Sequence, residues 1–184
     1  MQKKIIMKTK IVALLAILSL TIVSCNAVDD MLTFNIAQQS SFTVNSTLPI
    51  NAPLNVATPD VTTNSSEDFK NNNTKADLVK DVKLTALKLT ITDPSTQDFS
   101  FLKSVHVFIA TDNDPEIELA FLDDINSSAN TLNLTCSGQK LDNYIKASSF
   151  KLRTAVTTKK VTTQDVSIKA DMNFKVTADP IKAL

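Results

Sequence analysis

Apolar and polar residues alternate along most of the second half of the chain. Six segments carry apolar side chains at every second position with polar side chains between them: 84–92, 105–109, 117–121, 132–136, 150–156 and 166–176. In the last segment, every second residue from Val166 to Val176 lies on the apolar face, whereas Lys169 and Asp171 lie on the polar face. A period of two predicts β-strands with one buried and one wet face.

Two earlier segments, 32–36 and 41–50, have the same character. Turn residues such as Asp93-Pro94 and Ser137-Gly138 lie between the predicted strands. Strands repeated at short intervals with turns between them are typical of two packed antiparallel sheets. We therefore predict an all-β fold, an antiparallel immunoglobulin-like β-sandwich of about seven to eight strands.

Two regions interrupt the alternation. Residues 51–75 are rich in Asn, Pro, Ser and Thr and are predicted to form a long crossing loop. Ser65–Asp68 and Thr74–Asp77 resemble capping boxes, which predicts one or two short helical turns. Leu141, Tyr144 and Ile145 share one helical face, so 141–145 is predicted to be a short helix between two strands.

The first 24 residues have the pattern of a leader. Residues 1–10 contain four lysines and no acid, and residues 11–23 are apolar apart from Ser19 and Thr21. A basic start followed by an apolar run of about 7–15 residues is typical of a secretory signal. The run is too short for a membrane-spanning helix.

Cys25 follows this leader, and Ile22-Val23-Ser24-Cys25 resembles the lipobox at the end of a type II signal peptide in bacterial lipoproteins. The resemblance implies cleavage before Cys25 and acylation of its thiol and of the new amino terminus. Two or more acyl chains give stable membrane attachment. The expected organisation is a signal peptide (1–24), a lipidated tether (25–30) and a single sandwich domain (31–184).

Asp29 and Asp30 resemble the acidic signals that send lipoproteins of the Bacteroidota to the outer face of the outer membrane; the alternative is a solvated tether. Residues 77–111, DLVKDVKLTALKLTITDPSTQDFSFLKSVHVFIAT, resemble a group of uncharacterised Bacteroidota lipoproteins in which an LxLxI strand precedes an FSFLKS turn and strand. The likeness covers roughly residues 31–180. It implies an all-β envelope lipoprotein and brings no activity.

Composition narrows the function classes. The chain has equal numbers of acidic and basic residues, so removing the four leader lysines leaves a net charge of −4. This balance gives no electrostatic reason to expect nucleic acid or anionic lipid as a partner. A single glycine, Gly138, leaves little material for phosphate-binding loops. With Cys25 acylated, Cys136 has no disulfide partner, and its alternation predicts a small buried residue.

Acidic residues gather in the segment TDNDPEIE, where Asp112, Asp114 and Glu116 alternate with other residues. Alternate carboxylates in a loop could hold a weak calcium ion, which takes about six to eight oxygen ligands. The other interpretation is a solvated turn between strands, because Asp and Asn tolerate turn geometry. Calcium is the single cofactor that the sequence suggests, and the turn is the interpretation we favour.

His106 is the one histidine, and it is out of phase with Val105 and Val107. No nucleophile motif accompanies it, so we expect a protein that is not an enzyme. The sequence favours a lipid-anchored interaction or scaffold module of the bacterial outer membrane, on its surface or its periplasmic face, with an envelope protein or extracellular polymer as partner. The alternative is ligand capture, of a glycan or small apolar molecule, in a pocket of Phe99, Phe101 and Phe108.

Overall fold

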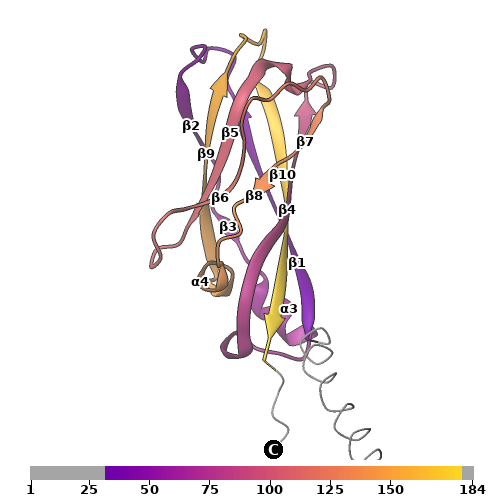
Figure 1. The fold of residues 1–184 in the computed structure, drawn as a ribbon, viewed down its shortest axis with the longest axis vertical. Helices are drawn as coiled ribbons and strands as arrows, with labels where there is room; N and C mark the ends of the chain where they lie inside the picture. Colours follow the sequence, from indigo (N-terminus) through magenta and orange to yellow (C-terminus); the bar gives the residue numbers. More distant parts are fainter. Residues whose placement is uncertain (1–31, 180–184) are drawn as a thin grey trace, which may run out of the picture.

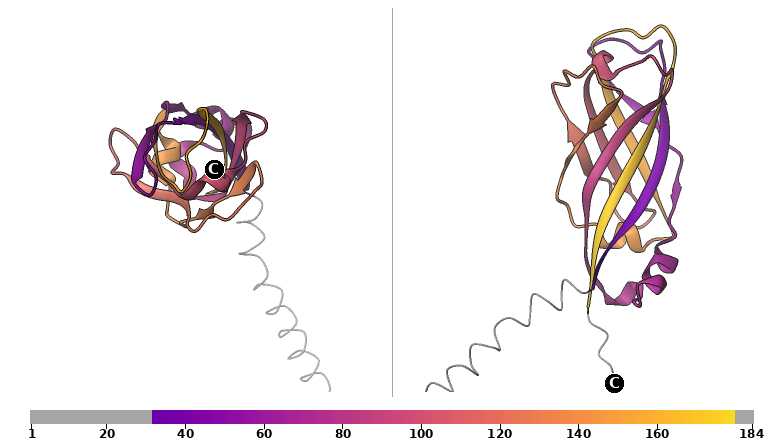
Figure 2. Two further views of the ribbon diagram at one scale, coloured as in Figure 1. Left: turned by 90° about the horizontal axis from the view of Figure 1, so that it is seen from above. Right: turned by 90° about the vertical axis from the view of Figure 1, so that its right-hand side faces the viewer.

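The computed structural model describes residues 32–179, which form two antiparallel sheets packed face to face (Figure 1). The first sheet has four strands in the order β1 (Thr33–Val44), β10 (Val166–Ala178), β4 (Val79–Asp93) and β7 (Thr131–Asn133). Its three long strands lie side by side, with β10 between β1 and β4 (Figure 2, right). The predicted antiparallel sandwich is thereby confirmed.

The second sheet has six strands. Five follow the order β2 (Pro53–Ala57), β9 (Ser149–Thr158), β5 (Leu102–Ala110), β6 (Ile117–Leu122) and β8 (Thr135–Cys136), and β3 (Val61–Thr62) also pairs with β9. The described residues thus form ten strands, more than the seven or eight expected. The additional ones are short, and β2 and β3 lie in the segment that was predicted to be a loop.

The core lies between the sheets and follows from the alternation in the sequence. In β10 every second residue from Val166 to Ala178 is buried, and Phe174 packs edge-on against Phe150 of β9. The central strand β4 contributes Leu87 and Leu89 from the same sheet. Each large side chain fully removed from water contributes about 1.5–3 kcal/mol, so these faces hold the sheets together.

The predicted helical turns exist, but their caps differ from the prediction. Helix α3 spans Ser65–Asn71, a 3₁₀ turn spans Ala76–Leu78, and helix α4 spans Asp142–Lys146, whereas a second 3₁₀ turn at Phe99–Phe101 was not predicted. Asn64 and Lys75 occupy the N-cap positions of the first two, without side-chain capping bonds. The hydroxyls of Ser65 and Thr74 are instead buried without a partner. The capping-box predictions were wrong, because Ser65 is already the first helical residue of α3 and Thr74 lies one residue before the N-cap of the 3₁₀ turn.

One predicted strand boundary differs from the structure. The two segments 32–36 and 41–50 were expected as separate strands, whereas β1 runs without interruption from Thr33 to Val44. Residues after Val44 turn away, and Ile50 makes only an isolated bridge to Thr158. The polar stretch Gln38–Ser41 that divides the apolar pattern is still extended, because β10 pairs with all of it.

Candidate functional site

The free edge of strand β1 is the longest unpaired strand edge among the described residues. β1 lies at the end of its sheet, and β10 is its single partner among the strands that the structure describes. The Ala178 amide donates to the Leu32 carbonyl, in line with the register Thr33↔Thr177. In an antiparallel ladder hydrogen-bonded pairs recur at every second residue. The even-numbered residues of β1 therefore bond to β10, and the odd-numbered residues point their backbone groups away from the sheet.

In the described part of the chain, the outer edge of β1 carries none of the usual protections of an edge strand. Asn35, Ala37, Gln39, Ser41 and Thr43, the odd-numbered residues from 35 onward, are all exposed. β1 contains no charged residue and no proline. It pairs with β10 over twelve residues without a bulge. Natural proteins usually protect long edges with charge, proline or bulges, so this edge has the features of a strand that pairs with another chain.

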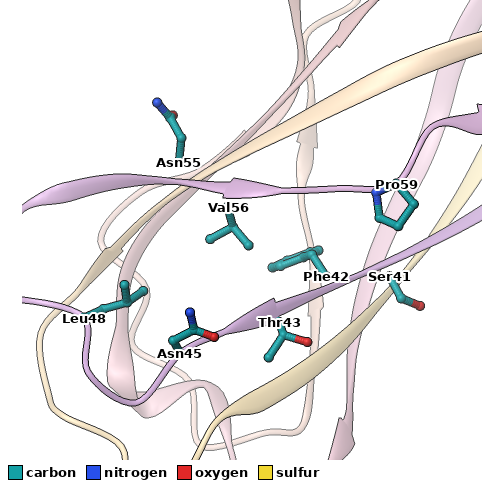
Figure 3. A pocket seen from close by; sticks show the side chains of 8 residues that line it. All are labelled: Ser41, Phe42, Thr43, Asn45, Leu48, Asn55, Val56 and Pro59. Atoms are coloured by element: carbon teal, nitrogen blue, oxygen red, sulfur yellow. The ribbon is translucent and has the colours of Figure 1, made fainter.

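A groove runs beside the second half of this edge, between β1 and β2. Its volume is about 390 Å³, and Phe42, Leu48 and Val56 form its apolar floor (Figure 3). Polar and proline residues complete the lining: Ser41, Thr43, Asn45, Asn55 and Pro59. None of the eight lining residues is charged. The groove therefore offers apolar contact directly next to unpaired backbone groups.

The opposite side of the sandwich is closed by the chain itself. β7 pairs with β4 in the first sheet, and β8, two residues further on, pairs with β6 in the second. Leu134 lies between them, is buried, and donates its amide to the Leu87 carbonyl at 2.9 Å. Because one segment crosses from sheet to sheet, both edges on this side end in strands of two or three residues.

His106 lies on the solvent face of the six-stranded sheet. A bulge in β6 sets its surroundings: Val107 pairs with Ala120 and Phe108 with Glu118, so Leu119 has no opposite residue. Glu118 consequently joins the outer face, and its carboxylate lies 2.7 Å from His106 Nδ1. Asp123 lies 3.1 Å from Nε2 on the other side of the ring. The two carboxylates hold the imidazole between them.

The rings of Phe108 and Phe121 flank His106 in nearly parallel planes, at centroid distances of 6.4 and 5.9 Å. Partial burial lowers the pKa of His106, but hydrogen bonds and charge from Glu118 and Asp123 outweigh it, so the pKa lies above 6.5. The protonated imidazole can donate to both carboxylates, whereas the neutral ring can donate to only one. Both ring nitrogens of His106 thus have a carboxylate partner within the protein.

Each of the three carboxylates of the predicted acidic turn accepts a hydrogen bond from a different side chain. Lys151 Nζ donates to Asp112 at 2.7 Å, and Asn143 Nδ2 donates to Asp114 at 2.9 Å. Arg153 holds Glu116 with two bonds of 2.9 and 2.7 Å. The hydrogen bond from Lys151 lowers the pKa of Asp112, and the bonds from Arg153 lower that of Glu116.

The three carboxylates thus point to different partners. Among residues 32–179 no group of three His, Cys, Asp or Glu side chains has the arrangement of a metal site. Arg153 also lies over Phe108, with 4.0 Å between its Cζ atom and the ring centroid, which links the turn to the His106 face. Calcium at Asp112, Asp114 and Glu116 stays a prediction.

The phenylalanine pocket suggested by the sequence is not assembled. Phe99 and Phe101 are buried in the core, whereas Phe108 lies on the outer face under Arg153. The prediction failed because Phe108 is out of phase with the inward residues Val107 and Ile109 of its strand. Cys136 is half-buried, and burial raises the pKa of its thiol above the usual range.

The predicted lipid anchor at Cys25 and the export signal at Asp29 and Asp30 lie outside the described residues. In the part that the structure covers, 32–179, no helix is both long and apolar enough to span a bilayer.

The β1 edge and its groove were not identified from the sequence. The signal was available in part, because TFNIAQQSSFTV is a long extended segment without charge. The sequence did not show which strands are neighbours in the sheets. Only the sheet order shows that β1 has β10 on one side and, among the strands of residues 32–179, none on the other.

No protein-family model and no curated protein matches the chain. Among solved structures it is similar to FlhE, with 9% identity, a TM-score of 0.32, and 78% of this chain and 97% of that chain covered. A structure of turnip yellow mosaic virus gives 14% identity and a TM-score of 0.30, covering 82% and 96%. One of Desmodium yellow mottle tymovirus gives 10% and 0.24, covering 82% and 85%. Likenesses of this size carry no argument about function.

Proposed function

We propose that this protein is a non-enzymatic interaction module of the bacterial outer envelope, anchored by lipid at Cys25. The observation that carries the proposal is the outer edge of β1 from residue 34 to residue 44, which is uncharged and has no strand beside it among residues 32–179. Backbone donors and acceptors on an edge strand are a ready template for pairing with another chain. The partner is an envelope protein or an extracellular polymer.

The positions of the described chain ends and of the groove support this proposal. The described ends, Leu32 and Asp179, lie at the same end of the sandwich, at the start of β1 and after the end of β10 (Figure 1). The groove lies toward the other end of β1, which a strand of twelve residues places about 40 Å away. A tether at Cys25 therefore holds the membrane-proximal end and leaves the groove turned outward.

Site-specific photo-cross-linking in living cells tests the proposal. A photoreactive residue replaces Gln39 on the edge in one strain and Lys88 in another. Lys88 faces solvent on β4 of the same sheet and is the matched control. We expect one discrete adduct at position 39, identified by mass spectrometry, and none at position 88. Identical adducts at both positions, or none at either, would contradict the proposal.

The anchor is tested separately by metabolic labelling with a clickable fatty acid. The wild-type chain should take up the label, and a Cys25→Ala variant should not. Protease treatment of intact cells, with a periplasmic protein as control, then decides between the two faces of the membrane. Digestion of the domain in cells that protect the control places it at the surface, where Asp29 and Asp30 would direct it.

The second candidate is capture of a small apolar molecule or glycan in the groove between β1 and β2. Its volume of about 390 Å³ and the floor of Phe42, Leu48 and Val56 favour it. A ligand that binds only the folded state raises the midpoint of thermal unfolding. A shift with a fatty acid or oligosaccharide that disappears in Val56→Lys would support capture. Equal midpoints with and without each compound would remove it.

A further inference from the structure

We infer that the β1 edge and its groove accept an extended strand from a different polypeptide, with apolar residues at every second position, as a fifth strand of the four-stranded sheet. This inference deepens the proposed function and rests on it. Strand addition of this kind uses backbone hydrogen bonds for affinity and pockets for alternate side chains for specificity. Both parts are present along β1.

The hydrogen bonds come from the odd-numbered residues. Asn35, Ala37, Gln39, Ser41 and Thr43 each offer one amide and one carbonyl to the outside. These groups exchange water for a partner backbone when a strand docks, with a net gain of about 0.5–1.5 kcal/mol per bond. The edge spans enough residues for a ladder as long as an ordinary strand of about five to six residues.

The groove sets the pattern of the incoming strand. Its inward side chains would lie over Phe42, Leu48 and Val56, while those between them would lie beside the exposed row that contains Gln39 and Thr43. Neither β1 nor the groove contains a charge that could pair with a charged inward side chain. Burying an unpaired charge is costly, so the groove-facing positions must be uncharged.

A second copy of this chain fits the site less well. Its β1 could pair antiparallel about a two-fold axis at Gln39, because the outward residues 35–43 are symmetric about that position. The apolar residues of that copy's β1, such as Ile36, are already buried in its own core and cannot fill the groove. Antiparallel pairing would also place the two membrane-proximal ends about 40 Å apart, at opposite ends of the pair.

Peptide binding to the full-length lipidated protein in detergent micelles tests the inference. The probe is a fluorescent peptide with the sequence of residues 166–178, VSIKADMNFKVTA, which alternates and natively pairs with β1 on its other side. The control peptide has the same composition in an order without alternation. We expect saturable binding of the probe by fluorescence anisotropy and none of the control.

Two variants of one residue separate backbone pairing from other contacts. Gln39→Pro removes an outward amide at an edge position that tolerates proline, and should weaken probe binding about tenfold. Gln39→Thr keeps the amide and should bind like wild type. Hydrogen exchange should show slowing at Ala37, Gln39 and Ser41 when the probe is bound. Val56→Lys should weaken binding through the groove.

The inference is overturned by equal binding of the probe to wild type and to Gln39→Pro, by equal binding of probe and control, or by no binding of the probe. It is also overturned if sedimentation shows a dimer that Gln39→Pro dissociates, because the edge then pairs with its own copy. An adduct at Gln39 in cells together with a failed probe would retain the interaction module and remove strand addition.

Discussion

The two long sides of this sandwich end in different ways. On one side residues 131–136 cross from sheet to sheet, so the edge strands β7 and β8 are short and Leu134 closes the seam. On the other side β1 and β2 belong to different sheets, and a groove separates them. Within residues 32–179, a segment that crosses between the sheets thus closes one side of the sandwich and not the other. A domain of this size can therefore cover its strand edges with a crossing segment, so the size of the domain does not explain why the edge of β1 is open.

The largest expected effect comes from the closed seam. Leu134→Ala removes a buried side chain from the crossing segment and should lower the free energy of unfolding by about 2–4 kcal/mol. Val56→Ala at the open seam removes a half-buried side chain and should cost about 1 kcal/mol or less. Urea denaturation followed by circular dichroism measures both. Equal losses would mean that the two seams are packed alike.

The next comparison is between the two sides of β1. Gln38→Pro removes an amide that bonds to β10, and should cost about 2 kcal/mol because the facing carbonyl of Met172 loses its donor. Gln39→Pro, one residue further, removes an amide that faces solvent and should cost less than about 1 kcal/mol. The difference in denaturation midpoint checks the assignment. A reversed order would place the open side of β1 on the even-numbered residues.

A smaller effect is expected from His106, whose two ring nitrogens each have a carboxylate partner. Because its pKa is raised in the folded state, the stabilisation is complete below pH 6.5, the usual histidine value, and is lost as the pH rises through the folded value. The loss should be no more than about 1 kcal/mol, the size of a surface ion pair. Denaturation at pH 5.5 and pH 8.5, roughly one to two units either side of that value, measures it.

The matched control for this pH dependence is His106→Gln, which retains a hydrogen-bonding side chain and does not titrate. Its difference in stability between the two pH values should be smaller than that of wild type. If wild type and His106→Gln change by the same amount, the dependence comes from other groups.

The smallest effect is expected at the acidic turn. Asp112→Asn breaks an exposed ion pair with Lys151, and the midpoint of thermal unfolding should stay within measurement error. Calcium at about 1 mM would fill a weak site with the dissociation constant of an extracellular module. It should leave the midpoint of thermal unfolding of wild type unchanged, since Asp112, Asp114 and Glu116 have separate partners. A rise with calcium that Asp114→Asn abolishes would establish the alternative metal site.

The acidic turn and the His106 face show where sequence reasoning reached its limit. The alternation around Val105 and Val107 indicated that His106 does not share their face, and in the structure it lies on the opposite, outer face of the strand. The contact with Glu118 depended on the bulge at Leu119, where two consecutive residues, Leu119 and Ala120, are buried. A bulge leaves only a short irregularity in the pattern, so the pairing could not be predicted from the spacing of residues.

By itself the sequence determined the fold class, the strands with clear alternation and the short helix near Tyr144, because these depend on which side of a local element is apolar. It also carries the predicted anchor at Cys25. Only the tertiary structure decided which strands are neighbours, that β2 and β3 arise within 51–75, and that β1 has one open side. The physical reason is that backbone hydrogen bonds between strands are identical for every residue except proline, so the choice of neighbour depends on how both sheets pack around one core.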